Sequence, residues 1–198
     1  MSDGRPGAYR ELKALIRADL CRYENARGWA TGFARYLREP GFRFTFWLRT
    51  TAYLRGRTLL KPFYIVAAFM RRHYSIKYGF EIPVNTSIGP GFFLGHCGGV
   101  VVNANAVIGA NCNLSHGVTL GVSNRGDRRG CPSIGDSVYI GPGAVIIGKI
   151  SVGSNAAIGA NAVVTTDVED YGVAVGAPAR VISKQGSEGY IDWVDYKL

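Results

Sequence analysis

Two histidines occupy equivalent positions in a repetitive part of the sequence. His96 lies in FFLGHCGG and follows Leu94 by two residues, while His116 lies in NLSHGV and follows Leu114 by two. An imidazole exchanges protons near neutral pH, so a histidine held in a rigid frame can act as a general base towards a hydroxyl group. What such a base could act on depends on the elements that carry it.

These elements form a six-residue repeat. Branched aliphatic residues recur at every sixth position in three runs: 82 to 94, 102 to 120 and 134 to 164. Gly usually follows the aliphatic residue, and a small residue usually lies four positions after it, with Gly98 in this place after Leu94. This pattern predicts a mainly β fold, a parallel β-helix in which three hexads make one coil of 18 residues.

The spacing predicts that the two histidines stack. Their separation of 20 residues is one coil plus the two extra residues near CGGVV, so His96 and His116 should lie on one edge, one coil apart. Glu81, 15 residues before His96, should lie near the same edge, where its carboxylate could orient the imidazole. The second insertion, VSNRGDRRGCP at 122–132, predicts a protruding loop that closes over this edge.

The chain divides into three regions: an N-terminal helical region (1–79), the β-helix (80–182) and a C-terminal tail (183–198). Residues 1–79 carry 16 Lys/Arg against 5 Asp/Glu and have helical spacing of apolar residues, with a helix break expected at Gly28. This basic region is either a solvated helical surface or a peripheral contact with an anionic membrane. The tail either covers an end of the coils or packs on a neighbouring subunit.

Composition argues against several classes of protein. The sequence has no apolar stretch long enough to span a membrane and no signal peptide, which predicts a cytoplasmic protein. The basic helical region adds the inner membrane face as a second candidate location. The four cysteines lack CxxC spacing, so no disulfide frame or metal site is expected, and no nucleic-acid-binding motif is present. A zinc hydratase of the γ-carbonic-anhydrase type is disfavoured, because only two histidines lie in the coils. A non-catalytic scaffold and a ping-pong reaction through Cys97 or Cys131 remain alternatives.

The stretches FEIPVNTSIGPGFFLGHCGGVVVN (80–103), SHGVTLG (115–121) and VGAPARVI (175–182) resemble the serine acetyltransferases. They look closer still to relatives that O-acetylate sugars of capsules and exopolysaccharides. The resemblance implies a left-handed parallel β-helix, acetyl-CoA as co-substrate, no metal, and a homotrimer with acetyl-CoA between adjacent subunits.

The resemblance also implies roles for individual residues. His96 matches the catalytic base and Glu81 its acidic partner. Two serine-binding positions depart from the family, since Gly95 replaces an acidic residue and Cys131 replaces a loop histidine. Further acceptor-binding candidates are His116, Arg128 and Arg129. The candidates for binding acetyl-CoA are Gly121, Ser123, Gly141, Pro142, Ala160 and Arg180.

The two departures lead to the predicted function. A free amino acid needs a carboxylate for its ammonium group, and Gly95 supplies none. We therefore expect an O-acetyltransferase that moves the acetyl group of acetyl-CoA to a sugar hydroxyl in polysaccharide biosynthesis. The saccharide acceptor would be a polymer, a lipid-linked unit or a nucleotide sugar. The alternative is a serine O-acetyltransferase of cysteine biosynthesis.

Overall fold

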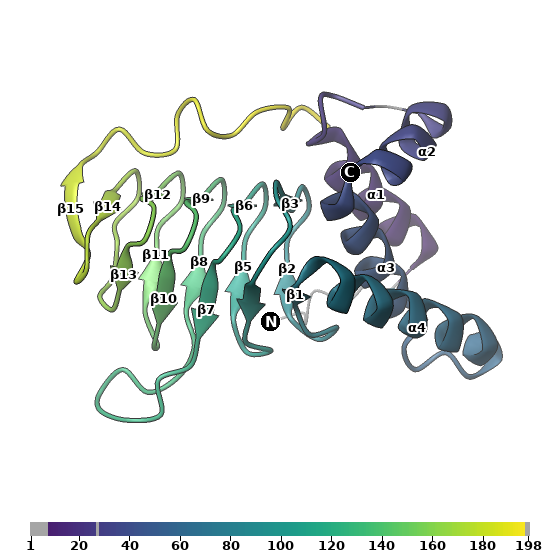
Figure 1. The fold of residues 1–198 in the computed structure, drawn as a ribbon, viewed down its shortest axis with the longest axis horizontal. Helices are drawn as coiled ribbons and strands as arrows, with labels where there is room; N and C mark the ends of the chain where they lie inside the picture. Colours follow the sequence, from purple (N-terminus) through teal and green to yellow (C-terminus); the bar gives the residue numbers. More distant parts are fainter. Residues whose placement is uncertain (1–7, 27, 197–198) are drawn as a thin grey trace.

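A computed structural model describes residues 8–26 and 28–196. The helices come first in the chain: α1 (Tyr9–Cys21), α2 (Trp29–Arg38), α3 (Pro40–Leu54) and α4 (Lys61–Tyr78), with a 3-10 turn at Thr58–Leu60 before α4. They gather at one end of the molecule, and a stack of strand coils extends away from them (Figure 1). The first helix ends at Cys21, well before the break expected at Gly28, and Pro40 begins α3.

The coils are built from very short strands that form three sheets. Sheet A contains β1 (Phe80–Glu81), β4 (Val100–Val102), β7 (Thr119–Gly121), β10 (Val145–Ile147) and β13 (Val163–Val164). Sheet B contains β2 (Ser87–Ile88), β5 (Val107–Ile108), β8 (Ser133–Ile134) and β11 (Ser151–Val152). Sheet C contains β3 (Phe93–Leu94), β6 (Asn113–Leu114), β9 (Tyr139–Ile140), β12 (Ala157–Ile158), β14 (Val173–Val175) and β15 (Arg180–Ser183).

Each strand pairs in parallel with the strand one coil away, and only β15 pairs antiparallel. The chain therefore turns from sheet A to B to C in every coil, as the hexad period predicts. All 13 repeat aliphatics are buried: Ile82, Ile88, Leu94, Val102, Ile108, Leu114, Leu120, Ile134, Ile140, Ile146, Val152, Ile158 and Val164. They form the continuous core of a parallel β-helix.

One repeat position is displaced by the first insertion. The hexad pattern assigns Gly98 to the small-residue place, which is buried in the other coils, but Gly98 is exposed and Val100 fills that place with no exposed surface. The two extra residues lengthen the corner after β3, so the small residue lies on the bulged turn. Gly98 and Gly99 both have positive φ, at 117° and 66°, which glycine adopts without strain.

Side chains from the helices close the open end of the coils. Arg49 and Asp19 form a buried ion pair with a distance of 2.9 Å between Arg49 Nε and Asp19 Oδ2. Arg49 also donates to the carbonyl of Ile88 at 2.7 Å, and the Asp19 carboxylate accepts the N–H of Phe92 at 2.9 Å. No further coil exists below the first one, so these side chains satisfy backbone groups that would otherwise be buried without partners.

The C-terminal tail neither covers the far end of the coils nor leaves the molecule. From β15 it runs back along the corners between sheets B and C to the helices (Figure 1). Ser187 Oγ donates to the Ser137 carbonyl at 2.7 Å, and the Tyr190 ring stacks on Tyr139 at 4.3 Å. Arg22 Nε donates to the Asp192 carbonyl at 2.7 Å, which joins the tail to the helical end.

Candidate active site

The two histidines lie on the edge where sheet C turns into sheet A. We call the corners 95–99, 115–118, 141–144 and 159–162 the histidine edge. His96 follows β3 and His116 follows β6, and their ring centroids are 5.8 Å apart with planes inclined at 78°. Both side chains are exposed. The predicted stacking one coil apart is present, and it places two imidazoles on one accessible site.

Backbone hydrogen bonds fix the histidine edge along its length. Gly117 N–H donates to the Gly98 carbonyl at 2.7 Å, and Gly143 N–H donates to the His116 carbonyl at 2.9 Å. Gly98 N–H donates to the Tyr78 carbonyl at 2.9 Å. This N–H is therefore already satisfied and is not free to stabilise a reaction oxyanion. The bonds hold successive corners in register and make the edge a rigid platform.

Glu81 lies close to this edge in the first coil. Glu81 is exposed and pairs in register with Val101 of β4. Val101 follows His96 by five residues. Within the described part of the chain, no hydrogen bond or ion pair joins Glu81 to His96. The backbone thus places Glu81 beside β4 in sheet A, the strand that follows the corner carrying His96.

Three of the six residues predicted to bind acetyl-CoA lie on the histidine edge. Gly141 and Pro142 form the corner after β9, and Ala160 lies in the corner after β12. These corners continue the row from His96 and His116 towards the C-terminal coils. They offer backbone groups more than side chains to a bound ligand.

The other three acetyl-CoA candidates lie elsewhere. Gly121 ends β7, on the opposite side of sheet A, and Ser123 begins the 122–132 loop. Arg180 begins β15 and donates to the Ala179 carbonyl at 2.9 Å. Within one chain these residues do not join the row of Gly141, Pro142 and Ala160.

The long loop does not close over the histidine edge of its own chain. It is a hairpin in which Ser123 and Gly130 exchange two backbone hydrogen bonds of 2.9 Å. The loop leaves sheet A after β7, which is the next corner of the coil, and protrudes there (Figure 1). The expectation failed because one hexad along the chain turns the backbone to a different edge of the triangle.

The loop candidates are also separated from one another. Arg128 forms an ion pair with Asp167 at 3.1 Å, which fastens the loop to a later coil, whereas Arg129 is exposed. Cys131 is half-buried and packs against the core. Within one chain, none of the three lies on the histidine edge.

The two thiols considered for a ping-pong reaction are poor nucleophiles. Desolvation raises the pKa of both Cys97 and Cys131 above the ordinary thiol value. A reactive cysteine needs the opposite shift, from a helix N-terminus or a neighbouring cation. In the described ranges there is also no cluster of three or more side chains suited to hold a metal ion. The imidazoles are the best-placed groups for proton transfer.

Gly95 has a structural consequence beyond the missing charge. A Cβ added there would lie 3.1 Å from the ring of Phe93, so a larger residue would have to displace that ring. Phe93 packs against Tyr23 with centroids 4.7 Å apart. Tyr23 carried no signal in the sequence, because it belongs to the helical region and follows no repeat. In the structure its side chain nevertheless contacts Phe93 and Leu94, and Leu94 precedes His96 by two residues.

Comparison with known proteins gives a consistent result. The family model for the bacterial transferase hexapeptide, of six repeats, matches residues 131–166. A serine acetyltransferase from Helicobacter pylori is 38% identical over 124 residues, which are 63% of this chain and 72% of the relative. The solved serine acetyltransferase of Neisseria gonorrhoeae is similar with a TM-score of 0.73 and 35% identity, covering 90% of this chain and 67% of that one. A serine acetyltransferase solved as a complex with CoA has a TM-score of 0.70 at 28% identity.

These similarities overturn the predicted sugar acceptor and the closer resemblance to capsule enzymes. The prediction of a saccharide partner relied on two side chains, Gly95 and Cys131. The agreement with serine acetyltransferases instead extends over 124 aligned residues in the curated relative and most of the chain in the solved one. Loss of two side chains does not exclude serine, because other groups can contact a small amino acid.

Proposed function

Because the chain belongs to the serine acetyltransferase family of left-handed β-helix enzymes, and is thus an acetyl-CoA-dependent acyltransferase, we propose that its acceptor is the hydroxyl group of L-serine. The product is O-acetylserine, a precursor for cysteine biosynthesis. The observation that carries this proposal is the exposed His96 imidazole on a rigid edge, with His116 at 5.8 Å.

The proposed reaction is direct transfer. His96 takes the proton of the serine hydroxyl as the oxygen attacks the thioester carbonyl of acetyl-CoA. The C–O bond forms, the tetrahedral intermediate collapses and the C–S bond breaks. The imidazolium returns its proton to the leaving thiolate, so CoA leaves as a thiol and His96 is ready for another cycle.

Glu81 is proposed to orient His96 and to stabilise the imidazolium. Its exposed position on β1 leaves the side chain free to turn towards the histidine edge. A carboxylate beside an imidazole favours one tautomer and lowers the energy of the charged ring.

Acetyl-CoA is proposed to lie along the histidine edge, over Gly141, Pro142 and Ala160. At these corners Ala160 is exposed and Pro142 half-buried, so an extended pantetheine arm can lie over them with its thioester directed towards His96. Gly121, Ser123 and Arg180 would contact the same ligand from a neighbouring subunit or at its nucleotide end. CoA carries phosphates, and Arg180 offers a cation for them.

A homotrimer would complete the acceptor site. In one chain Arg129 and Cys131 lie at a different corner from His96, so they can serve the acceptor only from a neighbouring subunit. Arg129 would then bind the serine carboxylate, with His116 beside the hydroxyl. Arg128 is already paired with Asp167 and is left with a structural role. The native mass should be three times the 21.4 kDa of one chain.

The acceptor is tested by product analysis. Purified protein is incubated with acetyl-CoA and either L-serine, D-serine, L-threonine or glycerol, and the products are identified by mass spectrometry. O-acetylserine from L-serine, with little product from the other hydroxyls, supports the proposal. Acetylation of glycerol as fast as of serine, or no product with serine at saturating acetyl-CoA, would refute it.

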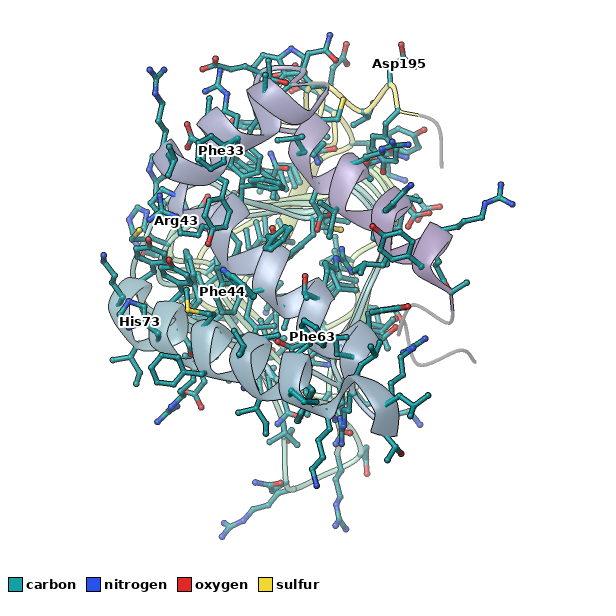
Figure 2. All side chains as sticks on the ribbon, turned by 90° about the vertical axis from the view of Figure 1, so that its right-hand side faces the viewer. Phe33, Arg43, Phe44, Phe63, His73 and Asp195 are labelled. Carbon is teal, nitrogen blue, oxygen red and sulfur yellow. The ribbon has the colours of Figure 1, made fainter. Side chains whose placement is uncertain are left out.

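We also propose that α4 contacts anionic lipid at its exposed face. Among the described residues no helix is long and apolar enough to cross a membrane. However, Phe63 and Phe69 on α4 and Leu59 just before it are 65–95% exposed, and α4 contains four Lys/Arg and no Asp/Glu. Figure 2 looks onto this end, with α4 and Phe63 in its lower half. Co-sedimentation with phosphatidylserine vesicles, absent with phosphatidylcholine alone and in Phe63→Ser, is the expected result. Equal recovery with both lipids contradicts it.

A further inference from the structure

We propose that Tyr23 is a positioning residue that holds the His96 corner in its reactive place. Tyr23 lies in the turn after α1, far from His96 in sequence. Its hydroxyl donates to the Leu94 carbonyl at 3.2 Å and accepts the Leu94 N–H at 3.4 Å. Leu94 is the last residue of β3, and His96 follows it by two. The proposal rests on the function proposed above for His96.

The contact exists because β3 is an edge strand. Sheet C runs in the order β15-β14-β12-β9-β6-β3, so nothing pairs with the outer side of β3. Phe93 N–H bonds inwards to the Cys112 carbonyl, and the polar groups of Leu94 point the other way. The single Tyr23 hydroxyl meets both of them, in the place where a further strand would lie. Burial raises the pKa of Tyr23, so the hydroxyl keeps the proton that it donates.

Tight packing prevents Tyr23 from moving away. The side chain is only 5% exposed, and its ring lies 4.7 Å from Phe93 and 5.8 Å from Phe42. The N-terminus of α3 packs against the same outer side of the strand, because a Cβ at Gly41 would overlap both the Leu94 carbonyl oxygen and the Tyr23 hydroxyl. The turn after α1 and the start of α3 thus form one clamp on the outer side of β3.

The corner that carries His96 has little stiffness of its own. Gly95, Gly98 and Gly99 surround the histidine, and the last two have positive φ. Besides the hydrogen bond from Gly117 N–H to the Gly98 carbonyl, the helical region fixes the corner at both ends. Tyr23 holds Leu94 before it, and after it Gly98 and Val100 donate to the carbonyls of Tyr78 and Gly79 at the end of α4. A general base displaced by a fraction of an ångström loses much of its rate, so the first anchor should matter for catalysis.

Tyr23→Phe tests this role, because it removes the hydroxyl and keeps the ring. We expect kcat to fall about tenfold while KM for acetyl-CoA stays within twofold, since the candidate acetyl-CoA corners lie in later coils. Tyr196→Phe is the matched control. It removes a hydroxyl that donates to Asn111 Oδ1 at 2.6 Å, on a different edge of the coils, and should leave kcat unchanged. Equal kcat for Tyr23→Phe and wild type, or equal losses in both variants, would overturn the proposal.

A second readout separates this proposal from the function on which it rests. The ring resonances of His96 are followed by NMR without any substrate and are assigned with His96→Ala. We expect Tyr23→Phe to shift or broaden the His96 signals and to leave those of His73 unchanged. Unchanged His96 signals would refute the positioning role, whatever the acceptor. If Tyr23→Phe does not fold, Phe93→Leu loosens the same clamp and is measured in the same way.

Discussion

His96 and His116 face each other across one coil of the β-helix, with ring centroids 5.8 Å apart. A single hydrogen-bond ladder fixes their corners, through Gly98, Gly117 and Gly143. One imidazole can therefore serve as base while the other contacts the same small acceptor. The repeat makes this possible, since it returns the chain to the same edge once in every coil.

Replacing Glu81 tests whether a carboxylate supports the base. We expect Glu81→Gln to lower kcat by about 10- to 100-fold, because the amide cannot stabilise an imidazolium, and to change KM for serine little. Steady-state kinetics provides the measurement. Glu169→Gln removes the charge of another exposed glutamate, which pairs with Lys184 at 2.9 Å, and should be silent. A Glu81→Gln variant as active as Glu169→Gln would exclude the role of Glu81.

The buried ion pair at the helical end should dominate the effect of charge changes on stability. Arg49→Met leaves the Asp19 carboxylate buried without its cation, which we expect to lower the free energy of unfolding by about 3–5 kcal/mol. Arg128→Met breaks an ion pair whose side chains are 45% and 59% exposed, so its loss should stay below about 1 kcal/mol. Urea unfolding of both variants measures the difference. Similar losses would show that the Asp19–Arg49 pair is not the cap described above.

Cys112 should make the fold sensitive to alkaline pH. Burial raises the pKa of this thiol to about 12, whereas an unfolded cysteine ionises near 8.5. Between these values the unfolded chain loses a proton that the folded chain keeps, so stability falls as pH rises from about 8.5. From pH 7 to pH 10 we expect Cys112→Ala to gain about 2 kcal/mol relative to wild type.

Urea unfolding at both pH values measures this change. Alanine occupies the equivalent buried position at Ala106, Ala144 and Ala156, so the substitution suits the repeat. Cys21→Ala, at another buried thiol outside the coils, is the comparison. A constant difference between Cys112→Ala and wild type across this range would show that the thiol does not titrate on unfolding.

Much of the fold follows from local pattern. An aliphatic residue in every sixth position can be buried only if the chain turns with that period, so Ile82 and Val164 could both be assigned to the core from sequence. The stacking of His96 on His116 follows from the same count. The exception is Gly98, because two inserted residues put Val100 in the buried position instead. The repeat pattern alone does not show which residues of a corner form the insertion.

The end of the coils could not be predicted in this way. Asp19, Tyr23 and Arg49 meet the first coil through tertiary packing of helices, and nothing in their spacing indicates a strand edge as the partner. The position of the 122–132 loop was misjudged because a triangular coil changes edge at every hexad. The predicted sugar acceptor was wrong because it relied on two substituted positions, Gly95 and Cys131. The similarity to serine acetyltransferases covers most of the chain.

The central claim is that His96 is the base of an acetyl transfer to serine, and thiol release from acetyl-CoA with L-serine tests it most directly. Wild-type protein, His96→Ala and His73→Ala are compared, with His73 as an exposed histidine on α4. We predict serine-dependent release by wild type and His73→Ala, and a loss of about 100- to 10,000-fold in His96→Ala. Release that His96→Ala retains at the wild-type rate would contradict the account.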